Sequence, residues 1–519
     1  MERRWWDSTA FFALMVLASM APLIVADVLP LVDLPGHLAR YRVALDLDTS
    51  EYLQRYFAFR WILSGNLGID LLIIPFSALG LEFGLKLLVT SIPAFATIGI
   101  FWTAREVHGR VPPTAMFAIP FLYGYPFNYG FLNFSLSMAL ALIALAFWIR
   151  LGRLDRDALR TILFVPISCL IWLAHAFGWG VLVLTAWSAE LIREHDAGRS
   201  WTKAFFGASL RTAALAPPLA LMILWRSGAA GGETTGFFTF IPKIFALLAA
   251  LRDNWLLWDS LGVAVALVLI GAARFDKRLE FSRKLAVPAA VLAITFLVMP
   301  GQIFGSAFAD MRLAPYMLIF TILAIRFRRE DDYAAMRTMA MLGLVFVAAR
   351  LVGNSVSFGM AGGELREQLR ALDHVPKGAA VLSLVGDTCN ETWRMPYHGH
   401  IGSYVIVRRE GFSNDQWRLA GAQMMTVKYY AAKNFALDPS QFVYSHACLK
   451  RTRQKLEKGE RLGRTVEQAM SEFPRSAFDY VWLVRVPDFD MSQRPGLVPI
   501  WRGRRSVLYK VDAPSSDRS

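Results

Sequence analysis

The sequence is poor in charge and in cysteine. Of its 519 residues only 18% are charged and 3 are cysteine, whereas 55% are hydrophobic. Because a soluble domain usually has ~25% charged residues, this composition excludes a disordered chain and a small disulfide scaffold. The chain also lacks a repeat of fixed period, and it has no Walker loop, HExxH, GxSxG or dinucleotide fingerprint in the required context.

Long apolar runs take the place of the missing charge. About eleven stretches approach the ~20 residues that a helix needs to cross a bilayer. These runs cover 11–28, 82–104, 112–126, 131–150, 160–175, 178–193, 204–226, 256–273, 285–300, 312–327 and 336–357. The first could be a signal peptide, but because so many others follow, we interpret it as an uncleaved anchor. The sequence therefore predicts a polytopic α-helical membrane protein of about eleven spans.

Charge is distributed unevenly among the loops. The net charge is +14, yet many of the charges sit in short loops, so we do not predict nucleic-acid binding. Because cytoplasmic loops carry the excess of Lys and Arg, we expect the N-terminus inside and the C-terminal region outside. The apolar segment 67–80 would break this alternation as a span, and we expect a re-entrant or interfacial helix there. The basic loops are 105–110, 150–160, 193–203, 274–284 and 326–337, and the loops poor in Lys and Arg are 121–133, 174–178, 227–255 and 300–311.

Composition divides the chain into a membrane part and a tail. Residues 1–360 hold the apolar runs and two long external loops, 30–66 and 227–255. Residues 361–511 have the composition of a soluble domain, and 512–519 are expected to be disordered. The mixture of patterns in the tail predicts a small α/β domain. Its strand-like runs are 379–384, 404–407, 480–484 and 506–511, and its helical patterns are 364–372 and 466–473.

The first external loop carries the main candidate for chemistry. In VDLPGHLARYR, a helix beginning near Pro35 would place Asp33 at its head and align His37 and Arg40 on one stripe. A carboxylate, an imidazole and a guanidinium at the membrane surface can act as a base, a proton partner and a phosphate ligand. The alternative is that Asp33 only caps the helix and that His37 and Arg40 are ordinary interfacial side chains.

Two aromatic segments accompany this candidate. From 42 to 61 the loop mixes aromatic rings with charges, which predicts an amphipathic helix in the interface, either as a membrane belt or as the wall of a lipid groove. The turn FLYGYPFNYGFLNF at 121–134 is aromatic and uncharged. Asn128 and Asn133 in this turn could bind a sugar between stacking Tyr rings, although an ordinary aromatic belt has the same composition.

Further polar candidates lie at the external ends of other runs. His175 stands in the turn WLAHAFGWG, where it would either face the substrate or only cap and pack. In GSAFADMRLAP, Asp310 and Arg312 would either pair with each other or leave Arg312 to hold an anionic head group. Glu233, in GGETTG, is the best candidate for a second acid on this side.

Two of the three cysteines, Cys389 and Cys448, lie in the tail. The predicted topology places the tail in an oxidising compartment, where a disulfide could join them. A metal site that uses the nearby histidines is a formal alternative, but the spacing of His398, His400 and His446 fits no established ligand pattern.

The layout resembles that of the integral-membrane glycosyltransferases of the C superfamily (GT-C), which use polyprenyl-phosphate sugars. PLVDLPGHLARY is similar to a motif of uncharacterised bacterial members, and NYGFLNFSLSMALALIALAFW, WLAHAFGWGVLVL and ADMRLAP are similar to their later segments. The resemblance covers 1–360 in outline and implies that Asp33 is the first-loop acid. The family's usual two adjacent acids are absent, because Val32 and Leu34 flank Asp33. No cofactor is assigned on this basis, and a divalent metal is left as an alternative.

The resemblance implies a fold and a reaction. We expect a GT-C-like enzyme of a bacterial inner membrane, with its tail in the periplasm, that moves a sugar from a polyprenyl-phosphate donor to a glycan, lipid or protein acceptor with inversion. Asp33 would be the general base with His37 as its partner, and Arg40 and Arg312 would stabilise the leaving phosphate. The alternatives are an O-antigen polymerase or ligase, a transporter or flippase of a lipid-linked saccharide, and a non-catalytic assembly subunit.

Overall fold

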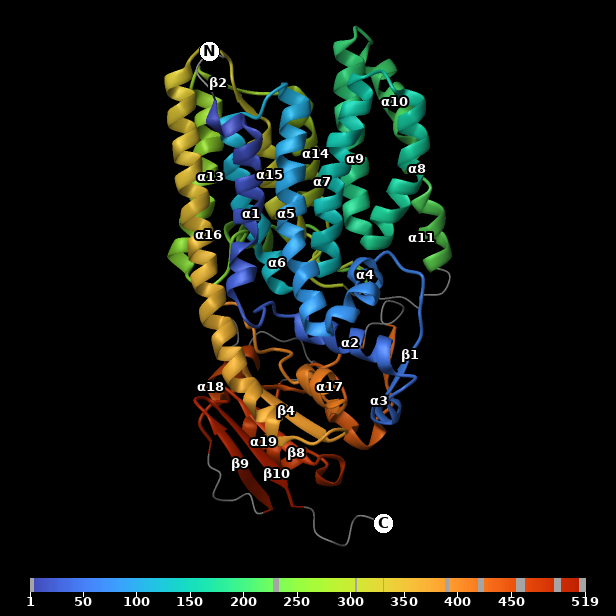
Figure 1. Cartoon of the computed structure of the whole chain (residues 1–519), viewed down its shortest axis with the longest axis vertical. Coiled ribbons are helices and arrows are strands. Elements are labelled where there is room, and N and C mark those ends of the chain that lie inside the picture. The colour runs from blue at the N-terminus through green and yellow to red at the C-terminus, as the bar shows by residue number, and fades with distance from the viewer. Residues whose placement is uncertain are drawn as a thin grey trace.

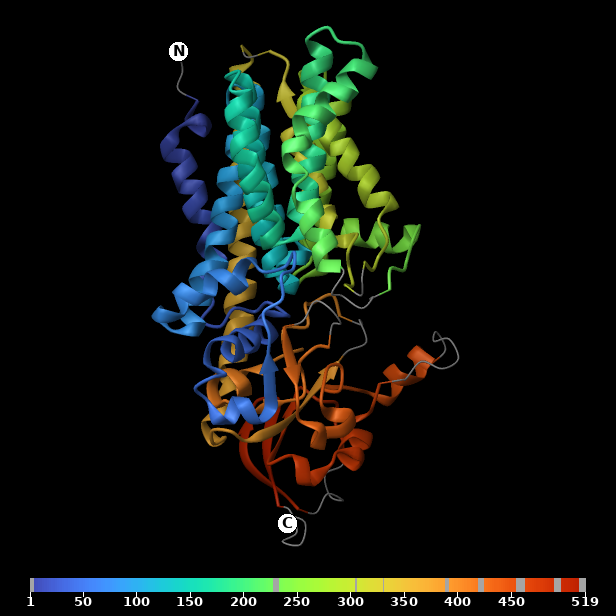
Figure 2. The same cartoon turned by 90° about the vertical axis from the view of Figure 1, so that its right-hand side faces the viewer.

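The computed structural model describes residues 4–226, 233–303, 306–329, 331–387, 392–418, 424–453, 463–489 and 496–512. A bundle of helices forms one end of the elongated molecule, and an α/β tail domain forms the other (Figure 1). The first external loop begins at the junction of the two and continues along the side of the tail (Figure 2). This arrangement confirms the predicted order of a helical membrane part followed by a tail that contains a sheet.

Each predicted apolar run contains a helix, but not each helix is a full span. Among the described residues five helices are long and apolar enough to cross a membrane, or six if the pair α10 and α11, bent by 60°, counts as one. The predicted number of about eleven spans is therefore not confirmed. The bundle helices are α1 (Thr9–Val25), α5 (Leu81–His108), α7 (Leu132–Arg153), α8 (Asp157–Ala174), α9 (Ala176–Asp196), α10 (Trp201–Thr212), α11 (Pro218–Arg226), α13 (Leu256–Phe275), α14 (Arg283–Val298), α15 (Ala314–Leu323) and α16 (Tyr333–Leu369).

The run at 112–126 departs from an ordinary span. Most of it forms the 3-10 helix η3 (Pro113–Tyr123), which is buried along its whole length. Pro112, Pro113 and Pro120 remove backbone donors from this segment, and proline disfavours the interior of a regular α-helix. The short helix α6 (Tyr125–Tyr129) follows and leads into α7.

The basic loops gather at the end of the bundle opposite the tail. Arg105 pairs with Asp7 at 3.1 Å, and Arg283 pairs with Asp196 at 3.0 Å. Strand β2 (Leu279–Phe281) pairs with β3 (Ile325–Phe327) at the same end, close to the N-terminus (Figure 1). The division of the loops into two classes, predicted from Lys and Arg alone, is thus a division between the two ends of the bundle.

The first external loop is a bridge to the tail. It contains α2 (Leu34–Asp46), α3 (Glu51–Tyr56) and β1 (Phe57–Phe59), and β1 pairs antiparallel with the tail strand β6 (Met425–Val427). The hydroxyl of Tyr56 donates to the carbonyl oxygen of Gly378 at 2.7 Å. The buried rings of this loop therefore pack on the tail rather than forming a membrane belt, which was one of the two roles considered for this segment. Segment 67–80 forms the short helix α4 (Gly68–Phe76) and the 3-10 turn η2 (Ser77–Leu79) at the same junction.

The tail is built on a mixed sheet of strand order β5-β4-β8-β10-β9, with β7 also beside β4. Strand β4 is parallel to β5, β7 and β8, and β10 is antiparallel to its two neighbours. This confirms the predicted sheet in the tail. The strands are β4 (Ala380–Asp387), β5 (Phe412–Ser413), β7 (Phe442–Tyr444), β8 (Tyr480–Val484), β9 (Leu497–Gly503) and β10 (Ser506–Val511), and the helices are α17 (Ser403–Arg409), α18 (His446–Arg453) and α19 (Val466–Glu472).

Two details of the tail differ from the prediction. The apolar run 404–407 predicts a strand, but it lies in helix α17, where all of its side chains are buried. The Asp415 carboxylate accepts a hydrogen bond from the Ser403 backbone N–H at 2.7 Å, so tertiary contacts override the β preference of this β-branched run. Helix α16 also continues across the expected boundary at 361 and carries the chain from the bundle into the tail (Figure 1).

Candidate active site

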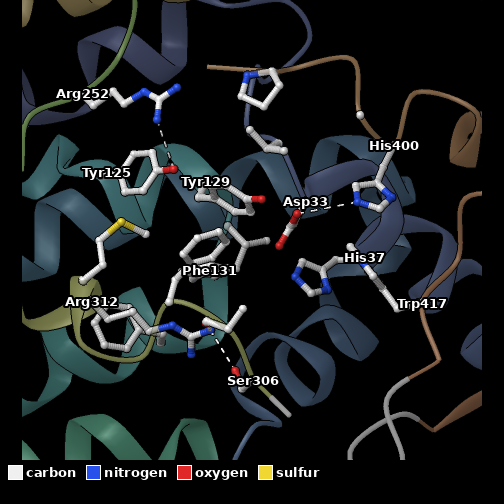
Figure 3. Close-up of a pocket in the computed structure, with 18 of the residues that line it drawn as sticks. Asp33, His37, Tyr125, Tyr129, Phe131, Arg252, Ser306, Arg312, His400 and Trp417 are labelled. Atoms are coloured by element: carbon white, nitrogen blue, oxygen red, sulfur yellow. Dashed lines mark hydrogen bonds and ion pairs between the residues drawn. The ribbon is translucent and has the colours of Figure 1, made fainter. Parts of the chain in front are cut away.

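A cavity of about 930 Å³ lies where the bundle meets the tail. Its wall combines the head of α2, the turn between α6 and α7, the region of α12 (Phe240–Leu248) and η5 (Met311–Leu313), and loops of the tail. Part of this wall is drawn in Figure 3. Seven of the nine predicted catalytic and substrate-binding residues line the cavity: Asp33, His37, Arg40, Asn133, His175, Asp310 and Arg312.

Asp33 occupies the N-cap position of α2, as its place before Pro35 predicted, but its carboxylate makes no capping hydrogen bond. Its backbone N–H donates to the carbonyl oxygen of Tyr129 at 2.9 Å. Gly130, at φ +98°, permits this approach, because a Cβ there would lie 2.9 Å from the Asp33 nitrogen. Local backbone contacts thus hold Asp33, and its side chain is left at the cavity.

The Asp33 carboxyl group lies in an environment that favours its protonated form. Burial, together with the nearby Asp438 carboxylate, raises its pKa to about 8, while the Arg312 guanidinium acts in the opposite direction. A carboxyl group whose pKa lies near neutral pH can both take up and release a proton. This environment fits a general base better than a helix cap.

The imidazole beside Asp33 comes from the tail. Nε2 of His400 lies 3.8 Å from Oδ1 of Asp33, and Figure 3 shows the two side chains facing each other. His37, the partner expected from the sequence, lies between Tyr41 and Trp417, with ring centroids 6.4 and 5.3 Å away. Burial lowers the pKa of His37 well below its usual range, with Arg40 and His400 adding to the effect. His37 is therefore a neutral ring in the wall.

Arg40 is neutralised by an acid that sequence analysis did not identify. Its guanidinium pairs with Asp70 of α4 at 2.8 Å, and both side chains are buried. The side-chain amide of Asn133 donates to the same carboxylate at 2.8 Å, and its oxygen accepts the backbone N–H of Ile69 at 2.6 Å. Both predicted ligands therefore contribute to a structural network in the cavity wall. The available signal was a single acid in the apolar segment 67–80, since such an acid needs a partner.

Two predicted substrate ligands lie away from the cavity wall. Asn128 is fully buried, and its amide donates to the carbonyl oxygens of Tyr123 and Arg252, both at 3.0 Å. Asn128 thus holds the aromatic turn to the second external loop, so the prediction of a sugar contact is not supported by its placement. Glu233 is exposed and does not line the cavity.

Of the two alternatives for Asp310 and Arg312, a pairing of the two with each other is not what the structure contains. Asp310 pairs with Lys243 of α12 at 2.9 Å, and Lys243 also donates to the carbonyl oxygens of Phe296 and Met299 at the end of α14. Asp310 and Lys243 therefore satisfy each other and fix α12 against α14. Residues two apart in sequence do not face each other on a helical turn, so a more distant partner fits Asp310 better.

Arg312 consequently keeps a positive charge at the cavity. Its guanidinium lies 4.1 Å above the ring of Phe131 and donates to the hydroxyl of Ser306 and the carbonyl oxygen of Ala307. Among the described residues its buried Nε has no hydrogen-bond partner. Within the part of the chain that the structure describes, no carboxylate comes within ion-pair distance of Arg312, which favours an anionic ligand here.

Arg252 also lines the cavity, although it is not among the predicted site residues. It donates to the carbonyl oxygens of Trp393 and Thr392 in the tail and to the hydroxyl of Tyr125. Figure 3 places it across the cavity from Asp33, as it does Arg312. A lone Arg in a long loop gave no sequence signal, because these contacts cross from the membrane part to the tail.

His175 has the capping role that was its alternative reading. Its Nδ1 accepts the backbone N–H of Phe177 at 3.1 Å, at the start of α9. A ring that accepts through Nδ1 carries its proton on Nε2 when it is neutral. His175 therefore caps a helix and presents a neutral donor in the cavity wall.

The cysteine and metal expectations stay predictions. Cys389 lies outside the described residues, while Cys448 is buried in the tail. No three His, Cys, Asp or Glu side chains in the described ranges come together so that they could hold a metal ion.

No family model and no curated protein matches the chain. The fold is similar to that of ArnT. ArnT from Cupriavidus metallidurans bound to undecaprenyl phosphate aligns at 12% identity with a TM-score of 0.48, over 98% of this chain and 98% of that chain. The same protein in the apo state aligns at 13% identity with a TM-score of 0.46, over 96% and 97% of the two chains. At this identity the likeness concerns the path of the chain alone.

Proposed function

We propose that this protein is a membrane glycosyltransferase that moves a sugar from a polyprenyl-phosphate donor to an extracytoplasmic glycan, lipid or protein, with inversion. The observation that carries the proposal is one cavity that holds a carboxyl group of pKa about 8 and, across from it, a guanidinium with no carboxylate partner among the described residues. The first can accept the proton of a hydroxyl, and the second can hold the phosphate that leaves. The sequence resemblance to GT-C enzymes supports the class of donor.

The reaction assigns one role to each group. The acceptor oxygen forms a bond to C1 of the sugar while the bond from C1 to the phosphate oxygen breaks. Asp33 takes the proton of the acceptor hydroxyl, and Arg312 stabilises the negative charge on the departing polyprenyl phosphate. Arg40 acts at a distance, because its ion pair with Asp70 fixes the helix that carries Asp33.

The test is sugar transfer by the purified protein with a panel of polyprenyl-phosphate sugars. Asp33→Asn preserves the size of the side chain but cannot accept the proton, so we expect kcat to fall by ~10²–10⁴-fold at equal expression. Near-normal transfer by this variant would remove Asp33 from the reaction. Movement of an intact lipid-linked saccharide across vesicles, without cleavage, would instead favour the transporter alternative, and polymer formation would favour the O-antigen enzymes.

The orientation proposed for the chain is an N-terminus in the cytoplasm and a tail in the periplasm. It is supported by the basic loops at the end of the bundle opposite the tail. A reporter fused after Phe358 should be active outside the cytoplasm, and one fused after Arg160 should be active inside. Activity of both fusions on the same side would contradict this orientation.

A further inference from the structure

The position of His400 is fixed by the tail. Its Nδ1 lies 2.8 Å from the carbonyl oxygen of Asp415, and because a carbonyl only accepts, Nδ1 carries the proton of the neutral ring. The Asp415 carboxylate in turn accepts from the N–H and the hydroxyl of Ser403, at 2.7 and 2.9 Å. This leaves the lone pair of Nε2 directed toward Asp33, 3.8 Å away.

Trp417, also a residue of the tail, packs against the His400 ring on the side that faces α2. Its indole lies 4.4 Å from the His400 ring and 5.3 Å from the His37 ring, measured between centroids. The indole also fills the space beside Gly36, where a Cβ would come 2.7 Å from Cζ3 of Trp417. The indole of Trp417 therefore packs between the first turn of α2 and the ring of His400, and this packing helps to set the distance from Asp33 to His400.

The groups around His400 are suited to a shared proton. Asp33 and His37 face it from α2, and Asp438 and the main chain of Asp415 face it from the tail. Burial lowers the pKa of His400, whereas the Asp438 carboxylate raises it. An imidazolium formed here would lie between two carboxyl groups, so a proton can move from Asp33 to Nε2 without leaving a bare charge.

We propose that His400, supplied by the tail domain, positions the carboxyl group of Asp33 and exchanges its proton, a role that rests on the sugar transfer proposed above. The proton of the acceptor hydroxyl passes to Asp33 as the bond from the acceptor oxygen to C1 forms and the bond from C1 to the phosphate oxygen breaks. It then passes to Nε2 of His400, which restores the carboxylate, and Nε2 releases it to water once the products have left. The Nδ1 proton stays on its bond to Asp415 throughout. The tail is thereby part of the active site rather than a separate module.

Two substitutions at His400 remove proton exchange while each keeps a different part of the polar contacts of the ring. The amide of His400→Asn can still donate to the Asp415 carbonyl, but it does not extend to the Nε2 position. His400→Gln keeps a polar atom near that position, but an amide takes no proton. We expect both variants to lower kcat by about 10²-fold while the KM for the donor stays within about twofold of the wild-type value. The apparent pKa in the dependence of kcat on pH should fall in both variants. Nε2 of His400 is an acceptor beside protonated Asp33, which favours the protonated form of Asp33 and so raises its pKa.

His398 is the matched control. It is buried two residues away on the same loop, but its Nε2 lies 3.8 Å from Glu364 and it does not line the cavity. His398→Gln should therefore leave kcat and the rate profile unchanged. A His400→Gln variant with wild-type kcat and an unchanged profile would overturn the proposal, as would an equal loss of kcat in His400→Gln and His398→Gln.

A measurement without catalysis distinguishes this inference from the proposed function. Thermal unfolding in detergent of Asp33→Asn, His400→Asn and the double variant forms a cycle, in which we expect non-additive effects. The cycle of Asp33→Asn with His398→Gln should be additive. If Asp33 and His400 are coupled but the protein transfers no sugar, the pairing of the two residues stands and the proposed function is wrong. If the protein transfers sugar but the two substitutions are additive, the proposed function stands and the pairing is wrong.

Discussion

Arg40 and Asp70 form a buried ion pair at 2.8 Å that joins helix α2 to helix α4. Asn133 of α7 donates to the same carboxylate, so three segments that are far apart in sequence meet at one acid. The pair is the structural support of the first turn of α2, where Asp33 stands. Charge in this part of the wall is thus used to fix helices, and only Arg312 and Arg252 present guanidinium groups without a carboxylate partner among the described cavity residues.

Asp70→Asn should destabilise the protein strongly, because it leaves the buried guanidinium of Arg40 without a counter-ion. Removing one partner of a buried ion pair typically costs ~3–5 kcal/mol. The midpoint of thermal unfolding in detergent should fall accordingly. Asp276→Asn, which removes the carboxylate partner of the exposed Arg278, should change the midpoint little. Equal effects of the two substitutions would show that the Arg40 pair is not a support of the fold.

The stability of the protein should depend on pH through Asp33. Its pKa rises from 3.8 to about 8 on folding, so between these values the folded state binds the proton more tightly than the unfolded chain does. The stabilisation from this proton is complete below pH 3.8, the pKa of the unfolded chain, and is lost as the pH rises through about 8, the pKa of the folded protein. Asp33→Asn removes this dependence, so its unfolding midpoint should rise relative to the wild type as pH increases. Parallel midpoint curves for the two proteins would contradict the raised pKa.

Arg312→Gln should lower kcat by ~10²–10³-fold, the usual cost of losing one group that stabilises developing charge. Arg312→Lys should be intermediate, because lysine keeps the charge but lacks the planar group that stacks on Phe131. The measurement is single-turnover transfer, together with binding of the polyprenyl phosphate product. A Gln variant that transfers sugar at the wild-type rate would place the leaving phosphate elsewhere in the cavity.

Gly36→Ala should separate the tail from the first turn of α2. The new Cβ would come 2.7 Å from Cζ3 of Trp417, and overpacking of this kind typically costs ~1–3 kcal/mol. We expect a lower unfolding midpoint and slower transfer. The smaller ring of Trp417→Phe, combined with Gly36→Ala, should recover part of both losses, and a double variant worse than either single one would contradict this explanation.

Peptide mapping without reduction should find Cys389 joined to Cys448. The prediction depends on an oxidising compartment for the tail. Protein isolated from its native membrane is the appropriate sample, and the third cysteine, Cys169 of α8, is a free thiol that serves as an internal control. Free thiols at both tail positions would refute the bond.

Local sequence patterns determined the elements of this protein. Apolar runs marked the bundle helices, and the distribution of Lys and Arg divided the loops into the sets found at its two ends. Pro35 and the preceding acid marked the start of α2, because both residue types have a positional preference at a helix N-terminus. The runs at 379–384, 480–484 and 506–511 became strands β4, β8 and β10. These signals are reliable because each depends on neighbours within a few residues.

Tertiary structure alone decided which charges meet. Asp310 pairs with Lys243 rather than with its near neighbour Arg312, and Arg40 pairs with Asp70. The ring nearest to Asp33 belongs to His400 of the tail, while His37, one helical turn away in sequence, faces Trp417. Run 404–407 likewise became helical because its surroundings bury it on all sides. A side chain in a low-dielectric interior must find a partner wherever packing provides one, and sequence spacing carries no record of contacts that only the folded chain brings together.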